Sequence, residues 1–334
     1  MTTGQFCAAA LPAMPLAAGL VGLLLPRHAR GAARWLALGA IGAVAFLALL
    51  CAIDALGSFD LFGVGYRPID LSMRVAQFGD VPVTVVLRLD GLSALMASLV
   101  ALIALAVQVY STSHLARDVR YVPYAAQVTL FTGAMLLLVS SADLISLLVG
   151  WELMGLCSYL LIGHDRTNPA APAAARKAFV VTRIGDIGFL LGVVLLATAA
   201  DSFRFDDLTI GSEGAATAAG LLMLAGIVGK SAQFPLHAWL PDAMAGPTPV
   251  SALIHSATMV AAGVYVMSRL DFVFTGTDTV RIAVAVVGAV SIVLGACAAL
   301  ASDDLKRVLA WSTISQLGYM IAGVAVAPGI GAPL

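Results

Sequence analysis

Apolar runs of about 20 residues recur along the chain, and each is bounded by a charged or Pro/Gly-rich connection. A run of that length crosses a hydrocarbon core of about 30 Å as an α-helix. The pattern therefore predicts an all-α integral membrane protein with about ten transmembrane helices. The expected spans are 8–25, 35–57, 89–110, 121–140, 143–163, 176–200, 217–239, 249–270, 281–301 and 308–327.

The connection over 58–88 is the longest and the least helical in pattern. Its alternating stretch from Val81 to Leu87 predicts a short extended segment or hairpin at one face of the membrane. Basic residues gather in the first connection, which holds Arg27 and Arg30, and in every second one after it. By the positive-inside rule these connections lie in the cytoplasm, so the hairpin region and both termini lie outside.

Composition agrees with a membrane protein and excludes a soluble enzyme. Hydrophobic residues make up 60% of the chain and charged residues 11%, whereas soluble domains carry about 25% charged residues. The net charge of −1 gives no indication of nucleic acid binding. The four cysteines are isolated in or beside apolar runs, with no metal-ligand spacing and no sign of a disulfide framework. No basic region precedes the first apolar run, so this run is predicted to be a membrane span rather than a cleaved signal peptide.

Four charged residues fall inside the expected spans: Glu152, Arg183, Asp186 and Lys230. Each costs about 2.5–3.5 kcal/mol at the centre of a membrane helix unless it pairs, reaches water or serves a function. Arg183 and Asp186 are three residues apart and can neutralise each other, so a packing ion pair and a functional role are equally open for them. Glu152 and Lys230 have no such local partner, which favours a functional role.

Lys230 is followed closely by Pro235 within the seventh expected span. Proline donates no backbone hydrogen bond, so the carbonyl of Ser231 loses its helical partner. Irregular backbone at membrane depth is tolerated where it is buried in protein or lines a hydrated cavity, and broken spans mark ion sites in transporters. A plain proline kink is the alternative. The Gly-Lys-Ser sequence is no P-loop, because the leading glycine of that motif would fall at Leu224.

The next span adds His255, about two turns from its start. Histidine titrates near neutral pH and can accept and pass protons, although a lone histidine in a helix is often a packing residue. We therefore hypothesise a water chain from Glu152 through Lys230 to His255 that conducts protons. A carboxylate that moves or changes its charge beside a buried ammonium can make the ammonium release its proton.

Several of these motifs resemble the L subunit of respiratory complex I, the largest antiporter-like subunit of bacterial NADH:quinone oxidoreductase. The resemblance runs over about residues 89–325 and is carried mainly by three stretches around the buried charges and by two near the eighth and tenth spans. These stretches are Gly150–Gly163, Lys177–Asp186, Gly229–Gln233, Asp242–His255 and Asp304–Met320.

The resemblance implies a proton-translocating membrane subunit built from two inverted five-helix repeats. Each repeat would contain a half-channel, and the seventh helix of the chain, in the first repeat, would be broken. It implies proton transfer through Glu152, Lys230 and His255, with Arg183 and Asp186 modulating the charge. The expected regions are 1–120 for the N-terminal helices and hairpin, 121–270 for a complete first repeat and 271–334 for the start of the second.

The resemblance also implies partners and a location. These are the other membrane-arm subunits of complex I, the lipid bilayer and protons, in the inner (plasma) membrane of a cell, with no nucleic acid. No flavin, iron–sulfur or nicotinamide motif is present, so we expect no cofactor in this chain, which would act as a subunit of a redox enzyme without a redox centre of its own.

The chain departs from the family pattern after the tenth span, where the family continues with a histidine-bearing eleventh helix, a lysine in the twelfth and a long lateral helix. We therefore expect a chain truncated in the second repeat. Two alternatives stay open beside the complex I subunit. One is the large subunit of a multisubunit sodium/proton antiporter or related ion transporter, and the other is an inactive or scaffold fragment.

Overall fold

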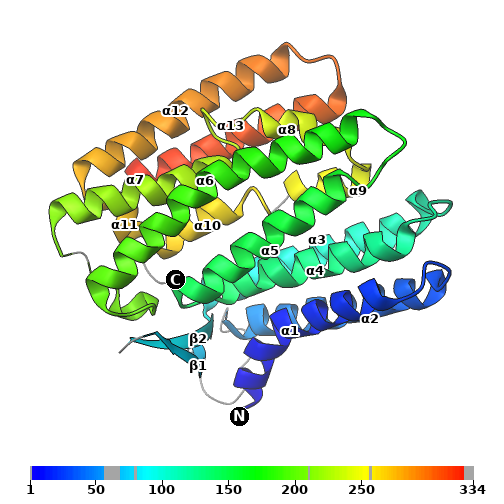
Figure 1. Ribbon diagram of the computed structural model, residues 1–334, viewed down its shortest axis with the longest axis horizontal. Helices are drawn as coiled ribbons and strands as arrows, with labels where there is room; N and C mark the ends of the chain where they lie inside the picture. The colour runs from blue at the N-terminus through cyan, green and yellow to red at the C-terminus, as the bar shows by residue number, and fades with distance from the viewer. Residues whose placement is uncertain (1, 56–67, 79–80, 210, 256–257, 327–334) are drawn as a thin grey trace. The chain divides into compact units, whose positions relative to one another are not determined.

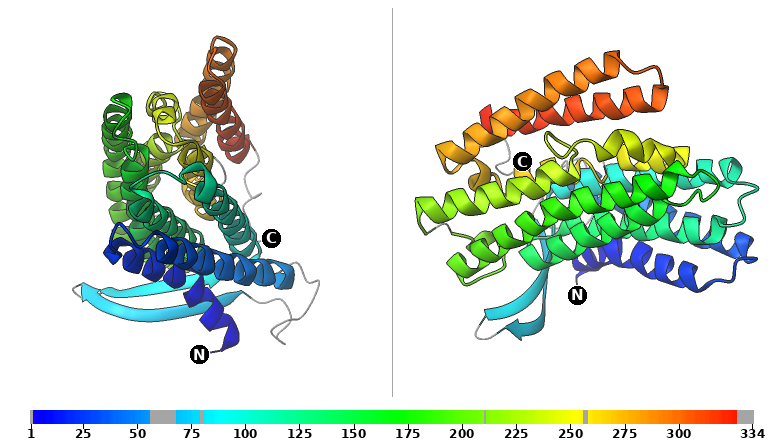
Figure 2. Two further views of the ribbon diagram at one scale, coloured as in Figure 1. Left: turned by 90° about the vertical axis from the view of Figure 1, so that its right-hand side faces the viewer. Right: turned by 45° about the horizontal axis from the view of Figure 1, so that its top comes forward.

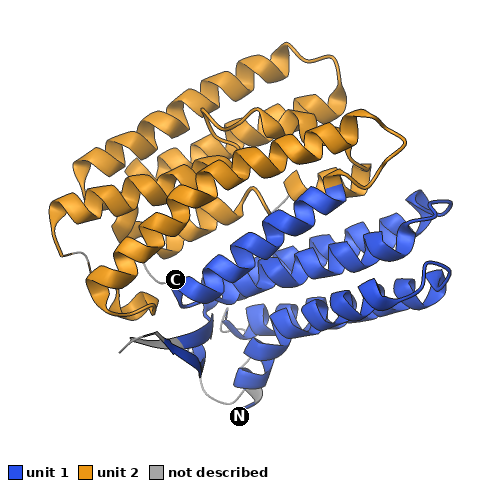
Figure 3. Cartoon of the chain, viewed as in Figure 1, with its two compact units in different colours: residues 1–161, 333–334 blue, residues 162–332 orange. Residues whose placement is uncertain are grey.

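The computed structural model describes residues 2–55, 68–78, 81–209, 211–255 and 258–326 (Figure 1). The last residues of the expected span 35–57 and the C-terminal stretch 327–334 lie outside these ranges. The chain divides into two compact units, one made mainly of residues 1–161 and the other of residues 162–332 (Figure 3). The boundary falls near the end of one helix, so the units differ from the repeats expected at 121–270 and 271–334, which stay predictions.

Unit 1 contains a hairpin and the first spanning helices. Its elements are α1 (Thr3–Leu24), α2 (Arg30–Ala55), β1 (Ile69–Phe78), β2 (Val81–Leu89), α3 (Gly91–His114), α4 (Tyr121–Ser140) and α5 (Leu144–Ile162). Two glycines allow α1 and α4 to pack closely, because a Cβ on Gly19 would lie 2.9 Å from the backbone nitrogen of Leu130, and one on Gly133 would lie 2.8 Å from that of Leu16.

The expected extended segment is confirmed as an antiparallel hairpin of β1 and β2. Asp70 faces Arg88 across the pair, and Arg88 Nε lies 2.8 Å from Asp70 Oδ1. The hairpin is joined to the connection between α4 and α5, since the amide of Val86 donates to Asp143 Oδ2 at 2.7 Å and its carbonyl accepts from Ala142 at 2.8 Å. Asp143 also accepts the amide of Ser146 at 2.7 Å and so caps the start of α5.

Unit 2 combines long helices with short, interrupted ones. Its elements are α6 (Ala170–Ala200), η1 (Phe205–Asp207), α7 (Glu213–Lys230), α8 (Trp239–Asp242), η2 (Ala243–Ala245), α9 (Thr248–His255), α10 (Ala262–Arg269), α11 (Asp271–Thr275), α12 (Asp278–Leu300) and α13 (Leu305–Val326). Helices α12 and α13 run side by side (Figure 2). Gly288 and Gly318 lie where they touch, and a Cβ on either would come within 2.9 Å of the other's carbonyl oxygen.

Eight helices of the described residues are long and apolar enough to cross a membrane: α1 to α6, α12 and α13. The other two expected spans, 217–239 and 249–270, are each divided into shorter helices. Many large apolar side chains on the long helices are exposed, among them Val180, Ile184 and Ile187 on α6. Such outward apolar faces suit contact with lipid, so the fold is that of a multi-pass integral membrane protein.

Candidate functional site

The break in the seventh span begins directly after Lys230, as the proline predicts. Helix α7 ends at Lys230, and helical structure resumes only at Trp239. Ala232 has a φ of 50°, in the left-handed region that non-glycine residues rarely adopt. The carbonyl of Ser231 is satisfied by a side chain, because Gln233 Nε2 donates to it at 2.9 Å. Trp239 Nε1 donates to the carbonyl of Gly229 at 2.9 Å, which replaces another helical bond.

Lys230 forms a buried ion pair with Asp186 on α6. Lys230 Nζ lies 3.3 Å from Asp186 Oδ2, and the two side chains are 0% and 1% exposed. Arg183 also approaches Asp186, with Nη1 3.9 Å from Oδ2, but its side chain is 33% exposed. The sequence predicted that Arg183 and Asp186 pair on one helix. The structure adds a nearer cation for Asp186, which is Lys230 on α7.

Close packing of α6 on α7 brings the two charges together. A Cβ on Gly185 would lie 2.6 Å from the carbonyl oxygen of Ala225, and Gly229 lies against Gly185 at van der Waals distance. Gly226 packs against the ring of Phe189 in the same way. Only glycine permits this separation, and it is small enough for a lysine at the end of α7 to reach an aspartate on α6.

Glu152 lies near the middle of α5 and is partly buried. It belongs to unit 1, whereas Lys230 belongs to unit 2. The expected communication between Glu152 and Lys230 therefore stays a prediction.

His255 is the last residue of α9 rather than part of a continuous helix over 249–270. Helix α10 starts only at Ala262, and the turn between them includes Thr258, whose hydroxyl donates to the carbonyl of Leu253. No local signal predicts this second interruption, because the stretch contains no proline after Pro249. Both broken spans thus carry their ionisable residue at the end of a helix.

The hydrogen bonds of His255 indicate its tautomer. His255 Nδ1 lies 3.4 Å from Thr313 Oγ1 on α13, and that hydroxyl donates to the carbonyl of Leu309 at 2.8 Å. A Thr313 hydroxyl that donates to Leu309 can only accept from Nδ1, an arrangement that corresponds to the tautomer with its proton on Nδ1. Nε2 is buried and has no hydrogen-bond partner among the described residues.

Helix α13 connects the two breaks. Thr313 meets His255, and the carbonyl of the next residue, Ile314, accepts a hydrogen bond from Gln233 Nε2 at 3.2 Å. Gln233 is fully buried and lies three residues after Lys230. Two neighbouring residues of α13 thus contact the segment after Lys230 and His255, respectively. Within the described ranges, no group of three or more histidine, cysteine, aspartate or glutamate side chains could hold a metal ion.

The connection between the two broken spans is held by side chains from its neighbours. Lys306 Nζ on α13 donates to the carbonyls of Met244 at 2.7 Å and Gly246 at 3.0 Å. Asn168 Nδ2 donates to the carbonyl of Ala245 at 3.1 Å. Sequence reasoning missed Lys306 and Thr313, although both lie in the Asp304–Met320 stretch that carries part of the resemblance.

The chain is similar to known proteins over most of its length. Residues 141–332 match the family model described as NADH:quinone oxidoreductase/Mrp antiporter, TM, and residues 76–125 match the model of complex I chain 5 N-terminus. Subunit 5 of the NAD(P)H-quinone oxidoreductase of the Paulinella chromatophora chromatophore is 49% identical over 257 residues, which cover 74% of this chain and 38% of that protein. The chloroplast subunit 5 of Chaetosphaeridium globosum is 45% identical over 248 residues, covering 71% of this chain and 37% of that protein.

Two solved structures share the fold. The Mrp complex of Dietzia sp. DQ12-45-1b superposes with a TM-score of 0.83 at 30% identity, covering 97% of this chain and 34% of that one. An archaeal membrane-bound sulfane sulfur reductase superposes with a TM-score of 0.80 at 20% identity, covering 96% of this chain and 65% of that one, and so supports the fold alone. The chain spans less than two fifths of the length of the curated relatives it matches. With a family model over more than half of its length, the chain belongs to the NADH:quinone oxidoreductase/Mrp antiporter family of transmembrane proteins.

Proposed function

We propose that this chain forms the proton-translocating part of an antiporter-like membrane subunit of NADH:quinone oxidoreductase. The observation that carries the proposal is the fully buried Lys230–Asp186 pair at the point where α7 breaks. Ionisable residues inside membrane segments are costly and mark ion or proton pathways. The subunit would move protons while redox chemistry takes place in other subunits of the complex.

Asp186 supplies a means of switching Lys230. Its carboxylate is shared between Lys230 at 3.3 Å and Arg183 at 3.9 Å, so a small movement toward Arg183 removes the nearest counter-charge from Lys230. An ammonium left without a counter-charge in an apolar interior releases its proton. Arg183 and Asp186 would then modulate the charge of Lys230 without themselves carrying the proton.

The released proton would travel toward His255. Gln233, which donates to α13, and Thr313 on that helix would lie along the path, and water molecules would complete it. The free lone pair of His255 Nε2 would accept the proton. Glu152 on α5 would supply or receive the proton at the other end of the path.

The proposed setting is a multisubunit complex in the inner (plasma) membrane of a cell, with other membrane-arm subunits as partners. The relatives are named as subunits of NAD(P)H-quinone oxidoreductase from a chromatophore and from chloroplasts.

The test uses the full-length protein in its complex, reconstituted in proteoliposomes. We expect Lys230→Ala to lower the number of protons moved per NADH oxidised, because the buried amine is the group that exchanges the proton. Arg281→Gln is a matched control, since Arg281 is half-exposed and pairs with its neighbour Asp278 at 2.7 Å, on the surface of α12. An unchanged proton-to-electron ratio in Lys230→Ala would reject the proposal.

A second candidate is the large subunit of a multisubunit sodium/proton antiporter. It is favoured by the likeness to the Mrp complex, which extends over 97% of this chain. Uptake of radioactive sodium into the same proteoliposomes under an imposed pH gradient distinguishes the antiporter from the complex I subunit. Sodium uptake that depends on Lys230, without NADH, would favour the antiporter.

A further inference from the structure

The turn between α1 and α2 and the turn between α3 and α4 lie side by side at one end of unit 1 (Figure 1). Arg30, the first residue of α2, joins them, because its guanidinium donates to the carbonyl of Asp118 at 3.3 Å and to the carbonyl of Leu115. Helices α1 to α4 are all candidate membrane spans. The two turns therefore lie where the chain leaves the hydrocarbon core, at the depth of lipid headgroups.

This end of unit 1 carries a strong excess of positive charge. Residues 24–36 and 114–121, which we call the basic end, contain five arginines and a single acidic residue, Asp118. The arginines are Arg27, Arg30, Arg34, Arg117 and Arg120. Five against one leaves a net charge of +4 with the histidines neutral. The connection over 52–91, at the other end of α2 and α3, contains five aspartates and three arginines, so the positive excess belongs to one end only.

Arg34 and Trp35 place a cation and an indole ring together on the surface of α2. The guanidinium carbon of Arg34 lies 5.2 Å from the centroid of the Trp35 ring, and Trp35 is 68% exposed. Arg30, one turn before Arg34, packs over the ring of Tyr121 at 4.4 Å, and the charge of Arg34 also acts on that tyrosine. Two guanidinium groups thus lie near one aromatic side chain, and Arg34 is the more exposed of the two.

Exposed apolar side chains accompany the arginines at the basic end. Leu24, the last residue of α1, and Val119 in the α3–α4 turn are 84% and 81% exposed. A free anion would leave these side chains and Trp35 in water, whereas a phospholipid brings an apolar part next to its charge. Tryptophan is enriched at the membrane–water interface, and guanidinium groups bind phosphate oxygens through paired hydrogen bonds. The positive-inside rule accounts for arginines in these turns, but not for the exposed indole held against one of them.

We propose that the basic end of unit 1 binds the headgroup of an anionic phospholipid. Arg34 binds the phosphodiester, the other arginines attract the negative headgroup, and the indole of Trp35 lies at the boundary between the headgroup and the acyl chains. Each basic residue beside a membrane span strengthens binding to anionic lipid about fivefold. The proposal goes beyond proton translocation and is tested by binding, so its outcome does not depend on whether the subunit pumps.

The experiment measures lipid contact at the basic end of the full-length protein in its detergent-solubilised, delipidated complex. Phosphatidylglycerol with a photoreactive diazirine on one acyl chain is the probe, and labelled peptides that span the basic end are quantified by mass spectrometry. We expect Arg34→Gln to raise the probe concentration for half-maximal labelling about fivefold. Arg34→Lys keeps the charge and should give an intermediate value, which covers the case in which Arg34→Gln does not assemble.

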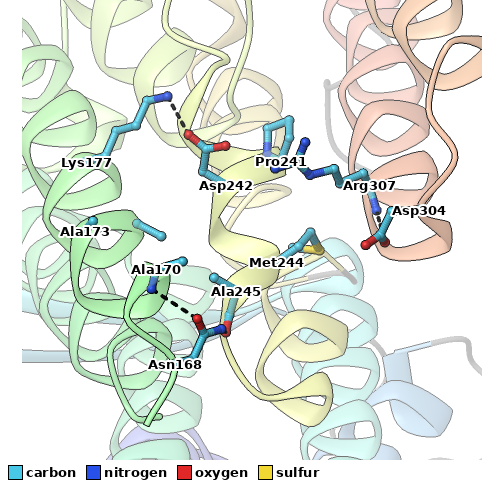
Figure 4. Close-up of a pocket in the computed structure, with 11 residues that line it drawn as sticks. Asn168, Ala170, Ala173, Lys177, Pro241, Asp242, Met244, Ala245, Asp304 and Arg307 are labelled. Atoms are coloured by element: carbon cyan, nitrogen blue, oxygen red, sulfur yellow. Dashed lines mark hydrogen bonds and ion pairs between the residues drawn. The ribbon is translucent and has the colours of Figure 1, made fainter. Parts of the chain in front are cut away.

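Arg307→Gln is the matched control. Arg307 lies near the start of another candidate span, α13, where it lines a polar cavity of about 500 Å³ in unit 2 (Figure 4). Asp304 lines the same cavity, so a negative charge accompanies this arginine. The control variant also removes one arginine from the chain, but it should leave labelling of the basic end unchanged.

Competition by unlabelled molecules decides what the basic end binds. Phosphatidylglycerol should compete better than phosphatidylcholine, whose headgroup has no net charge, and the difference should shrink as the salt concentration rises. Equal half-maximal concentrations in the wild type and Arg34→Gln, or equal competition by the two lipids, would overturn the proposal. Competition by inorganic phosphate as strong as by phosphatidylglycerol would identify a free-anion site and overturn the lipid assignment.

Discussion

Lys230 Nζ lies 3.3 Å from Asp186 Oδ2, closer than Arg183, the residue one helical turn before Asp186. The carboxylate is thus shared between a fully buried amine on α7 and a partly exposed guanidinium on its own helix. The shorter of the two ion pairs crosses between helices, and the pair that is local in the sequence is the longer one.

Removing one member of the buried Lys230–Asp186 pair should destabilise the protein far more than replacing both members. We expect Asp186→Asn to lower the free energy of unfolding by about 3–5 kcal/mol, because it leaves Lys230 buried without its counter-charge. The double variant Asp186→Leu with Lys230→Met should recover most of this loss. Thermal unfolding of the detergent-solubilised complex gives the comparison.

Arg183→Gln serves as the control, because its guanidinium is one third exposed and lies 3.9 Å from Asp186. We expect a loss of at most about 1 kcal/mol. Equal losses for Asp186→Asn and Arg183→Gln would contradict the assignment of Lys230 as the main partner.

The glycine contacts between α6 and α7 should also be sensitive to substitution. A Cβ on Gly226 would lie 2.9 Å from Cγ of Phe189, so Gly226→Ala should cost about 1–3 kcal/mol through overpacking. Gly214→Ala is a matched control on the same helix, since nothing lies within 4 Å of the added methyl group. It should be neutral or stabilise the helix by up to about 1 kcal/mol. Unfolding temperatures in which both variants behave alike would argue against the tight helix contact.

The sequence predicted the membrane class, most helix positions and the hairpin, because each rests on local information. A run of apolar residues needs no partner to indicate a span, and Pro235 alone predicts the break after Lys230. Alternating residues over 81–87 likewise predicted β2.

The contacts between helices could not be predicted from the sequence. Nothing near Lys230 indicates that Asp186, 44 residues earlier, is its partner, because that contact depends on which glycine faces align on α6 and α7. The interruption after His255 and the contact with Thr313 are likewise tertiary, and so is the carbonyl contact of Lys306. The role of Glu152 stays a prediction.

Thr313 should set the tautomer of His255 in the proposed path. Thr313→Val keeps the shape of the side chain and removes the acceptor for Nδ1–H, so His255 loses its preference for a free Nε2 lone pair. We expect proton transport to fall about fivefold, the effect of one neutral hydrogen bond of about 1 kcal/mol.

Ser312→Ala is the control for Thr313→Val, because the Ser312 hydroxyl donates to the carbonyl of Leu309 on its own helix, at 2.9 Å. The measurement is the initial rate of acidification in proteoliposomes, together with the nitrogen chemical shifts of His255. Transport and chemical shifts that match the wild type in Thr313→Val would contradict this role.

Lys306 should hold the start of α9 in place and thereby position His255 at the other end of that helix. Its ammonium donates to the carbonyls of Met244 and Gly246, so Lys306→Met removes two charge-assisted hydrogen bonds at once. We expect backbone amides at the start of α9 to exchange with deuterium at least about tenfold faster, since a loss of about 1.4 kcal/mol already gives that factor. Lys306→Arg keeps a donor and should restore part of the protection.

Lys177→Met tests whether this effect belongs to Lys306 or to any lysine at the same end of the unit. The Lys177–Asp242 pair is about two fifths exposed, so its loss should cost less than about 1 kcal/mol and change exchange in α9 only slightly. Faster exchange confined to Lys306→Met, with slower proton transport in the same variant, identifies Lys306 as a positioning residue. Equal exchange in both lysine variants would show instead that α9 is held by its own packing, since Val250, Leu253 and Ile254 are fully buried.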